Sequence, residues 1–338
     1  MRLDTGNRSF FGLLGIAFGA YVLVGMAACV LLALLGYRVS VDGLGALTAG
    51  GKNLWPAVAF LALVAVGAAL GVWSVRKQLA WTVRLRRRVR AMTLPAPPKL
   101  VASAQRVRLG ARVRLVDAEE AFSFTYGAFT PRVAVSRGLV DSVSDDELDA
   151  VLEHERYHVL NLDPLKVVIA RALSPAFFYI PALRDLRRRY IAGRELAADR
   201  RAVAAYGRRP LAGALFKVIR GPGGWRELGV AAAIGGPELL DVRVAQLESG
   251  SEPRVDPVST QSAVLSGMGV AVLLAAFVVT VTSFGGLGAV LRTTMPDMEL
   301  SAGAVLACIA CAAPLVGAGW AGYRWLSWRA RREVAAAP

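Results

Sequence analysis

Residues 144–158 read SDDELDAVLEHERYH, and they define the central helix of the predicted fold. Ser144 and Glu147 form a capping box, in which the serine accepts a hydrogen bond from a backbone amide and the glutamate reaches back. The apolar residues that follow repeat at helical spacing: Leu148, Val151, Leu152 and Tyr157. The sequence therefore predicts a helix that begins beside Ser144 and ends near Asn161 and Pro164.

The end of this predicted helix carries a His-Glu-x-x-His pattern, His154-Glu155-Arg156-Tyr157-His158, and the chain has no other histidine. Residues four apart lie on one face of a helix, so both imidazoles can reach one metal ion. Glu155 can then act as general base toward a metal-bound water. The alternative is a chance pattern with two partly solvated histidines, and the well-marked helix favours the metal site.

A catalytic zinc ion takes three protein ligands and leaves a fourth position for water. The third ligand here must be a carboxylate or a cysteine, and all three cysteines fall in long apolar stretches. Glu195 is the best candidate, because a helix predicted over about Leu183–Ala205 places it on one face with Asp199. Asp199 can then orient a ligand imidazole. The alternative is a solvated charged face, since seven arginines lie between residues 184 and 201.

The composition points to a membrane protein, because 55% of the residues are hydrophobic. Four uncharged stretches are long enough to cross about 30 Å of hydrocarbon at about 1.5 Å per residue. They run over about residues 10–35, 54–75, 263–284 and 300–323. We interpret them as four transmembrane helices rather than as buried core helices, and the first as an uncleaved anchor rather than a signal peptide.

Lysine and arginine in the flanks predict the orientation, because they gather on the cytoplasmic side of a membrane. Seven of them lie between residues 76 and 90, directly after the second stretch. We therefore expect a multi-pass protein of the cell membrane with both termini and the segment 76–262 in the cytoplasm. Anionic lipid headgroups are the expected partner of this basic segment, and they explain the net charge of +15 better than nucleic acid does.

Three parts follow from this interpretation: residues 1–75 with the first two spans, residues 76–262, and residues 263–338 with the last two spans and a basic tail. Within the middle part, three segments have strand patterns and precede the motif helix: Arg106–Val116, Phe122–Thr125 and Arg132–Ser136. A small sheet is therefore expected beside the helix that carries the two histidines.

The pair His154-Glu155-x-x-His158 and Glu195-x-x-Ala198-Asp199 resembles the integral-membrane gluzincin metalloproteases. This group includes CAAX prenyl endopeptidases, heat-shock membrane proteases and β-lactam-sensing signal-transducer proteases. The chain is most similar to the last of these, through Thr130-Pro131-Arg132-Val133 and the Ser-Asp-Asp-Glu-Leu helix entry. We expect no penicillin-binding sensor domain, because the chain ends soon after the fourth apolar stretch.

The resemblance implies a membrane α-helical fold of four transmembrane helices with an inserted cytoplasmic α+β zincin-like metalloprotease domain. It implies one zinc ion per chain, bound by His154, His158 and Glu195, with Glu155 as base. Asp199 and Asp163 would support the ligands. Residues Phe122, Ser123, Phe124 and Thr125 would form an edge strand that pairs with an extended protein or peptide substrate.

A donor for the oxyanion is not fixed by these patterns. Arg243 lies in Pro237–Leu247, which resembles the stretch that closes the domain in this group. Tyr190 and Tyr206 are the other candidates, and for both tyrosines the alternative is an ordinary buried aromatic side chain.

The predicted function is a zinc endopeptidase that cleaves membrane or cytoplasmic proteins. One alternative is a signal-transducing protease that cleaves a repressor or itself. Another is a catalytically silent scaffold stabilised by zinc, which would not need Glu155. A zinc transporter is disfavoured, because the four apolar stretches contain no His, Asp or Glu.

Overall fold

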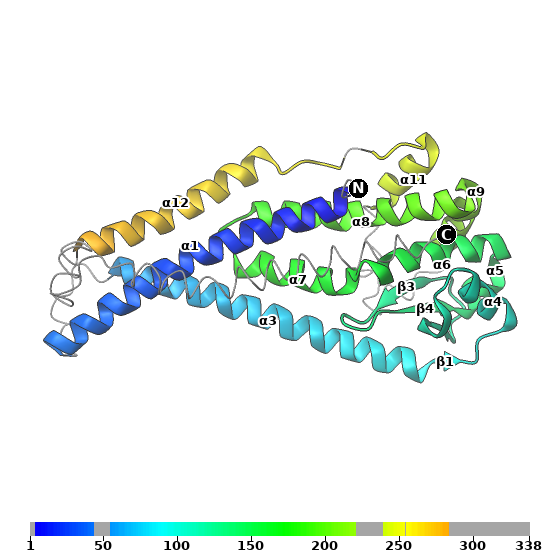
Figure 1. Cartoon of the computed structure of the whole chain (residues 1–338), viewed down its shortest axis with the longest axis horizontal. Coiled ribbons are helices and arrows are strands. Elements are labelled where there is room, and N and C mark those ends of the chain that lie inside the picture. Colours follow the sequence, from blue (N-terminus) through cyan, green and yellow to red (C-terminus); the bar gives the residue numbers. More distant parts are fainter. Residues whose placement is uncertain (1–3, 44–54, 221–238, 254, 284–338) are drawn as a thin grey trace. The chain divides into compact units, whose positions relative to one another are not determined.

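The computed structural model describes residues 4–43, 55–220, 239–253 and 255–283 (Figure 1). The predicted fourth span, residues 300–323, lies outside the described residues. The chain divides into two compact units. The sheet unit comprises Met1–Leu14, Gly71–Pro175 and Ala182–Ser259, and the span unit comprises Gly15–Leu70, Ala176–Pro181 and Thr260–Pro338.

A four-stranded mixed sheet lies in the sheet unit, in the order β1-β2-β4-β3. The strands are β1 (Thr93–Leu94), β2 (Val113–Val116), β3 (Ser123–Tyr126) and β4 (Arg132–Ser136). β2 pairs with β4 in parallel, and the other two pairs are antiparallel. β3 therefore forms one edge of the sheet, with Ser123 opposite Val135 and Thr125 opposite Val133.

Gly127 makes the turn between β3 and β4 possible. Its φ of +92° lies in a region that residues with a side chain rarely adopt, and a Cβ there would lie 2.7 Å from the carbonyl oxygen of Thr130. The strand prediction for 132–136 is confirmed, and that for 122–125 is shifted by one residue.

The predicted strand over Arg106–Val116 is wrong except for its last four residues. The segment before β2 forms α4 (Pro98–Arg106) and the 3-10 turn η2 (Gly110–Arg112). Pro98 lies in the first turn of α4, where its fixed φ suits a helix. Val107 and Leu109 are buried as the alternation suggested, but Arg108 between them has a φ of +57°, so the backbone there turns instead of extending.

Six more helices complete the described part of the sheet unit: α5 (Arg137–Ser142), α6 (Asp145–Leu160), α7 (Asp163–Ala176), α8 (Ala182–Tyr206), α9 (Arg208–Arg220) and α11 (Leu240–Ser249). The capping box at the start of α6 is present, with Ser144 and Glu147 bonded reciprocally. Leu148 and Leu152 of α6 pack in one buried cluster with Val133 and Val135 of β4. This packing holds the motif helix against the sheet.

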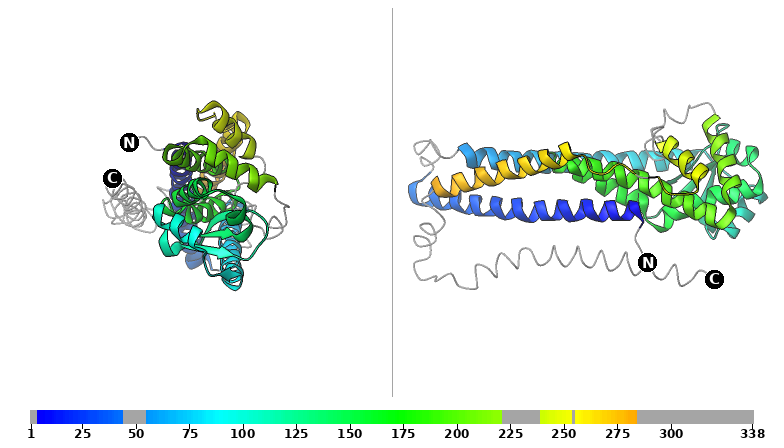
Figure 2. Two further views of the ribbon diagram at one scale, coloured as in Figure 1. Left: turned by 90° about the vertical axis from the view of Figure 1, so that its right-hand side faces the viewer. Right: turned by 90° about the horizontal axis from the view of Figure 1, so that it is seen from above.

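Three helices of the described residues are long and apolar enough to cross a membrane: Thr5–Leu32, Pro56–Ala91 and Thr260–Thr282. They belong to α1 (Thr5–Asp42), α3 (Trp55–Ala91) and α12 (Thr260–Ser283). In the span unit these helices lie side by side (Figure 2), and Leu31, Phe60 and Leu273 pack together between them. α3 continues through the basic segment 76–90 as one helix.

Replacing Ser144 with alanine removes the side chain that caps α6. We expect a loss of about 1 kcal/mol of unfolding free energy, since one amide of the first turn loses its hydrogen bond. Chemical denaturation of the detergent-solubilised protein measures this loss. Ser144→Asp keeps an acceptor and should retain the native stability, and equal stability of the alanine variant would show that the cap contributes nothing.

Candidate metal centre

α6 and α8 place three side chains against one point inside the sheet unit. His154 and His158 lie one turn apart on α6, Glu195 faces them from α8, and all three are buried. Their candidate ligand atoms lie within 4.8 Å of one another. The two Nε2 atoms are 3.1 Å apart, and the Glu195 oxygens lie 3.4 Å from His154 Nε2 and 3.7 Å from His158 Nε2.

These spacings fit a zinc ion. Two nitrogen ligands at tetrahedral positions around zinc, each about 2.0–2.1 Å from it, are roughly 3.4 Å apart. The three separations between the imidazole and carboxylate atoms bracket that value. Two histidines and one glutamate also form a donor set that catalytic zinc uses, with a position left for water.

The far nitrogens of both imidazoles face carboxylates. Asp163 Oδ2 lies 2.6 Å from His158 Nδ1 in a hydrogen bond, and Asp199 Oδ1 lies 2.8 Å from His154 Nδ1 in an ionic contact. A carboxylate beside Nδ1 favours the proton there, so in a neutral ring the lone pair is on Nε2. Two Nε2 lone pairs 3.1 Å apart repel each other. A cation between them would be attracted by both lone pairs, and the repulsion would be relieved.

The pKa values show how strongly the site attracts positive charge. Burial lowers the pKa of His158, but the carboxylates of Glu195 and Asp163 outweigh it and raise the pKa to about 10. The pKa of Glu195 lies well below its usual range, because His158 and Arg194 stabilise the anion more than burial disfavours it. A proton and a metal ion therefore compete with each other for Nε2 of His158.

Two arginines, Arg194, which is buried, and Arg243, which is nearly so, hold the carboxylates in place. Arg243 from α11 makes a bidentate pair with Asp199, with both contacts at 2.7 Å, and its Nη1 lies 3.8 Å from Glu195. Arg194 lies 3.1 Å from the other oxygen of Glu195. Burial of a carboxylate is costly unless it is paired, so these two cations keep Glu195 and Asp199 ionised.

Glu155 points toward the sheet rather than toward α8. The hydroxyl of Ser123 donates to its Oε1 at 2.9 Å, and the hydroxyl of Thr125 donates to its Oε2 at 2.7 Å. Both donors belong to the edge strand β3, and α6 packs beside that strand (Figure 1). Phe124 of β3 and Phe122 just before it are buried and stack on each other, and they pack with Leu85 and Val89 of α3 instead of with Glu155.

The structure brings most of the predicted residues together, although their roles remain predictions. Tyr190 is fully buried, and its hydroxyl donates to Asp163 Oδ1 at 3.0 Å. The same carboxylate is the partner of His158, so the hydroxyl of Tyr190 is already engaged. Tyr206 is not part of the cluster, because it lies eleven residues beyond Glu195 on α8, roughly 16 Å along the helix. It packs near Leu211 and Val203 instead.

Two features were missed from the sequence. Arg194 was one of seven similar arginines, and only its spacing of four from Tyr190 could have singled it out as buried. The hydroxyls of Ser123 and Thr125 alternate along a predicted strand, which placed both on one face but did not show that Glu155 lies there. Strand alternation sets the face, whereas the partner depends on how α6 packs.

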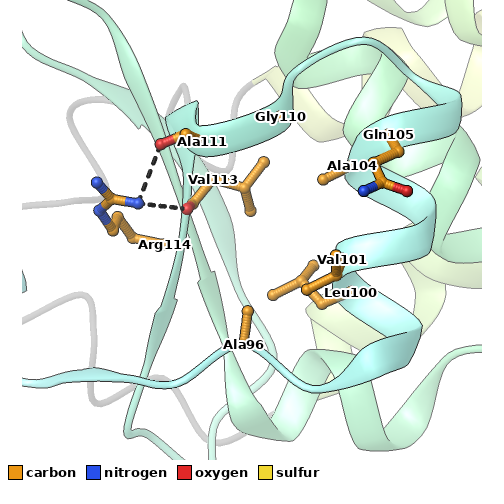
Figure 3. A pocket seen from close by; sticks show the side chains of 9 residues that line it. All are labelled: Ala96, Leu100, Val101, Ala104, Gln105, Gly110, Ala111, Val113 and Arg114. Carbon is orange, nitrogen blue, oxygen red and sulfur yellow. Dashed lines mark hydrogen bonds between the residues drawn. The ribbon is translucent and has the colours of Figure 1, made fainter.

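A separate pocket of about 270 Å³ lies between α4 and β2 (Figure 3). Apolar side chains such as Leu100, Ala104 and Val113 line it, and Arg114 turns away to the carbonyl oxygens of Ala111 and Val113. It contains none of the predicted site residues, so it takes no part in the metal centre.

Comparison with known proteins adds independent evidence. A family model described as BlaR1 peptidase M56 matches residues 49–247. A Protease HtpX homolog from Nostoc sp. (strain PCC 7120) is 30% identical over 100 residues, which cover 28% of this chain and 35% of that protein. Protease HtpX homolog 2 from Methanosarcina mazei is 52% identical over 48 residues, or 14% of this chain and 16% of that protein. The chain thus spans about a third or less of these relatives.

Replacing Asp199 with asparagine leaves a similar shape but removes the charge that faces His154 and Arg243. We expect zinc affinity to fall about 10- to 100-fold, because a ligand imidazole loses its anionic support. Competition with a chromophoric chelator measures the dissociation constant. Asp141→Asn, an exposed aspartate on α5, is the matched control and should change nothing. Unchanged affinity in the Asp199 variant would rule out its supporting role.

Proposed function

Because the match over residues 49–247 shows that the chain belongs to the BlaR1 peptidase M56 family, we propose that it is a zinc-dependent membrane endopeptidase. Its proposed substrates are membrane or cytoplasmic proteins. The observation that carries the proposal is the convergence of His154, His158 and Glu195, with Glu155 next to His154 on α6 and bonded to β3. A site that served stability alone would have no use for a buried carboxylate that ligates nothing and adjoins an edge strand.

Each residue has a defined task in the proposed reaction. When bound by the two histidines and Glu195, zinc supplies Lewis-acid chemistry and makes water acidic enough to lose a proton near neutral pH. Glu155 accepts that proton and delivers it to the leaving amine. Ser123 and Thr125 hold both oxygens of the Glu155 carboxylate, so the base is oriented before substrate arrives.

An extended substrate is proposed to pair with β3. This strand has a hydrogen-bonded neighbour on one side only within the described sheet, so its outer edge offers backbone donors and acceptors to another chain. Substrate backbone bound there would lie beside the residues that hold Glu155. Neither Arg243 nor Tyr190 is assigned as oxyanion donor, because both are bonded to supporting aspartates.

The membrane arrangement is also part of the proposal. We place the sheet unit and both termini in the cytoplasm, with four spans in all and the arginines of 76–90 against anionic headgroups. The three apolar helices of the described residues and the basic end of α3 support this arrangement.

Replacing Glu155 with glutamine tests the proposed base. We expect native zinc content but a loss of proteolysis of about 100-fold or more, because the amide cannot accept the proton. The assay uses quenched fluorescent casein with the purified protein in detergent, and zinc is counted by metal analysis. Full activity of the glutamine variant would exclude Glu155 as base, and a native protein that binds zinc without cleaving would favour a silent scaffold.

The hydroxyls of β3 can be removed without disturbing the metal ligands. In the double variant Ser123→Ala and Thr125→Val we expect kcat to fall about 10- to 100-fold with unchanged zinc content, because Glu155 loses its fixed orientation. Steady-state kinetics on the same casein substrate measure the change. Ser142→Ala, which removes a hydroxyl bonded to the Leu139 carbonyl far from Glu155, is the control and should leave kcat unaltered.

A further inference from the structure

The first turns of α1 contact the helices that carry the metal ligands. Within the sheet unit, Tyr157 of α6 donates to Asp4 Oδ2 at 2.6 Å. Asp4 also accepts from the backbone and the side chain of Asn7, at 2.7 and 3.0 Å. Tyr157 is the residue directly before His158, so residues 4–10 lie against the motif helix itself. We refer to Asp4–Phe10 as the α1 brace.

A chain of hydrogen bonds leads from the brace to His158. Lys166 of α7 donates to Asn7 Oδ1 and to Asn161 Oδ1, both at 2.7 Å. Asn161 donates in turn to Asp163 Oδ1 at 2.7 Å, and the other oxygen of Asp163 is the partner of His158. Lys166 is buried, so these contacts are shielded from water and their geometry matters.

A second route passes through aromatic rings. Phe10 is buried and packs on Tyr190, with ring centroids 5.2 Å apart. Tyr190 donates to the same Asp163 oxygen that Asn161 contacts. Asp163 is therefore fixed from two sides, and both sides rest on α1.

The brace also meets α8 one residue before a proposed ligand. Gly6 and Gly193 approach so closely that a Cβ on Gly6 would lie 2.7 Å from the backbone nitrogen of Arg194. A Cβ on Gly193 would lie 2.5 Å from the nitrogen of Gly6. Only glycine fits at either position, which seats α1 directly beside Glu195.

We propose that the α1 brace is a positioning element for the metal site, in which Gly6, Asn7 and Phe10 fix Asp163 and the start of the Glu195 segment. This proposal rests on the proposed zinc-dependent function. The brace supplies none of the three proposed metal ligands. It acts through Asp163 on the ring of His158 and through the Gly193–Arg194 backbone on Glu195, so its loss weakens zinc binding before it affects any chemical step.

Glycine substitutions on α1 give a matched test. Gly6→Ala inserts a methyl group against the Arg194 backbone, whereas Gly12→Ala on the same helix meets nothing within 4 Å. Both variants exchange glycine for alanine on the same helix, and only the one at Gly6 places the new methyl group against another helix, so a difference between them reports the contact. We expect zinc affinity, measured by chelator competition in the full chain, to fall about three- to tenfold for Gly6→Ala and to stay native for Gly12→Ala.

A second pair of variants tests the proposal even if Gly6→Ala fails to fold. Asn7→Ala should weaken zinc binding about three- to tenfold, and Arg8→Ala, an exposed neighbour, should not. In an Asp163→Asn background the effect of Asn7→Ala should shrink to less than about twofold, because its route to His158 is already broken. A general loss of stability would instead persist in that background.

The outcomes separate the two proposals. A native protein that binds no zinc overturns the proposed function. Zinc binding that is native in the chain and weakened by Asp163→Asn, yet unchanged by both Gly6→Ala and Asn7→Ala, overturns the brace alone. The visible absorption of the cobalt(II)-loaded protein gives a further readout, since a displaced His158 alters the ligand geometry around the ion.

Discussion

The site depends on two imidazole nitrogens that face each other 3.1 Å apart in the interior. Neither could remain there as a neutral pair without a compensating charge, because carboxylates on the far side of each ring favour the proton at Nδ1. The surrounding helices supply that environment: α6 carries the rings, α7 begins with Asp163, and α8 carries Glu195 and Asp199. Apolar packing holds α6 against the sheet, and α7 and α8 supply the charges that the two rings require.

Burial of so many charges in a small volume restricts what the sequence can tolerate. Four carboxylates (Glu155, Asp163, Glu195 and Asp199) are buried with Lys166 and Arg194, and Arg243 is nearly so. Burial of any one of these charges would be costly by itself, and its charged or hydrogen-bonded partners offset that cost. Removal of one partner leaves its neighbour unpaired in a medium of low dielectric, so the cluster behaves as a unit. Single substitutions of Asp163, Glu195 or Asp199 are therefore expected to affect metal binding and folding together, whereas those at Glu155 and on β3 should leave the zinc content native.

Local patterns predicted the parts of the fold that depend on local rules. The capping box predicted the start of α6, and helical spacing predicted both ends of α8 to within one residue. The length of the apolar stretches predicted the three described helices that are long and apolar enough to cross a membrane. The strand over 106–116 failed, because burial alternated while the backbone turned at Arg108. Long-range contacts could not be predicted: the pairing of Ser123 with Glu155 and of Asp4 with Tyr157 spans 32 and 153 residues. Neither has a local signal.

The presence of only two histidines, both at the metal centre, has a practical consequence. Selective isotope labelling of histidine would give a nuclear magnetic resonance spectrum in which every imidazole signal arises from this one point in the molecule. Protonation, tautomer and ion binding at each ring could then be followed separately without assigning the rest of a membrane protein. A preparation purified without a polyhistidine tag would carry its own spectroscopic probe, already placed where the chemistry is proposed to occur.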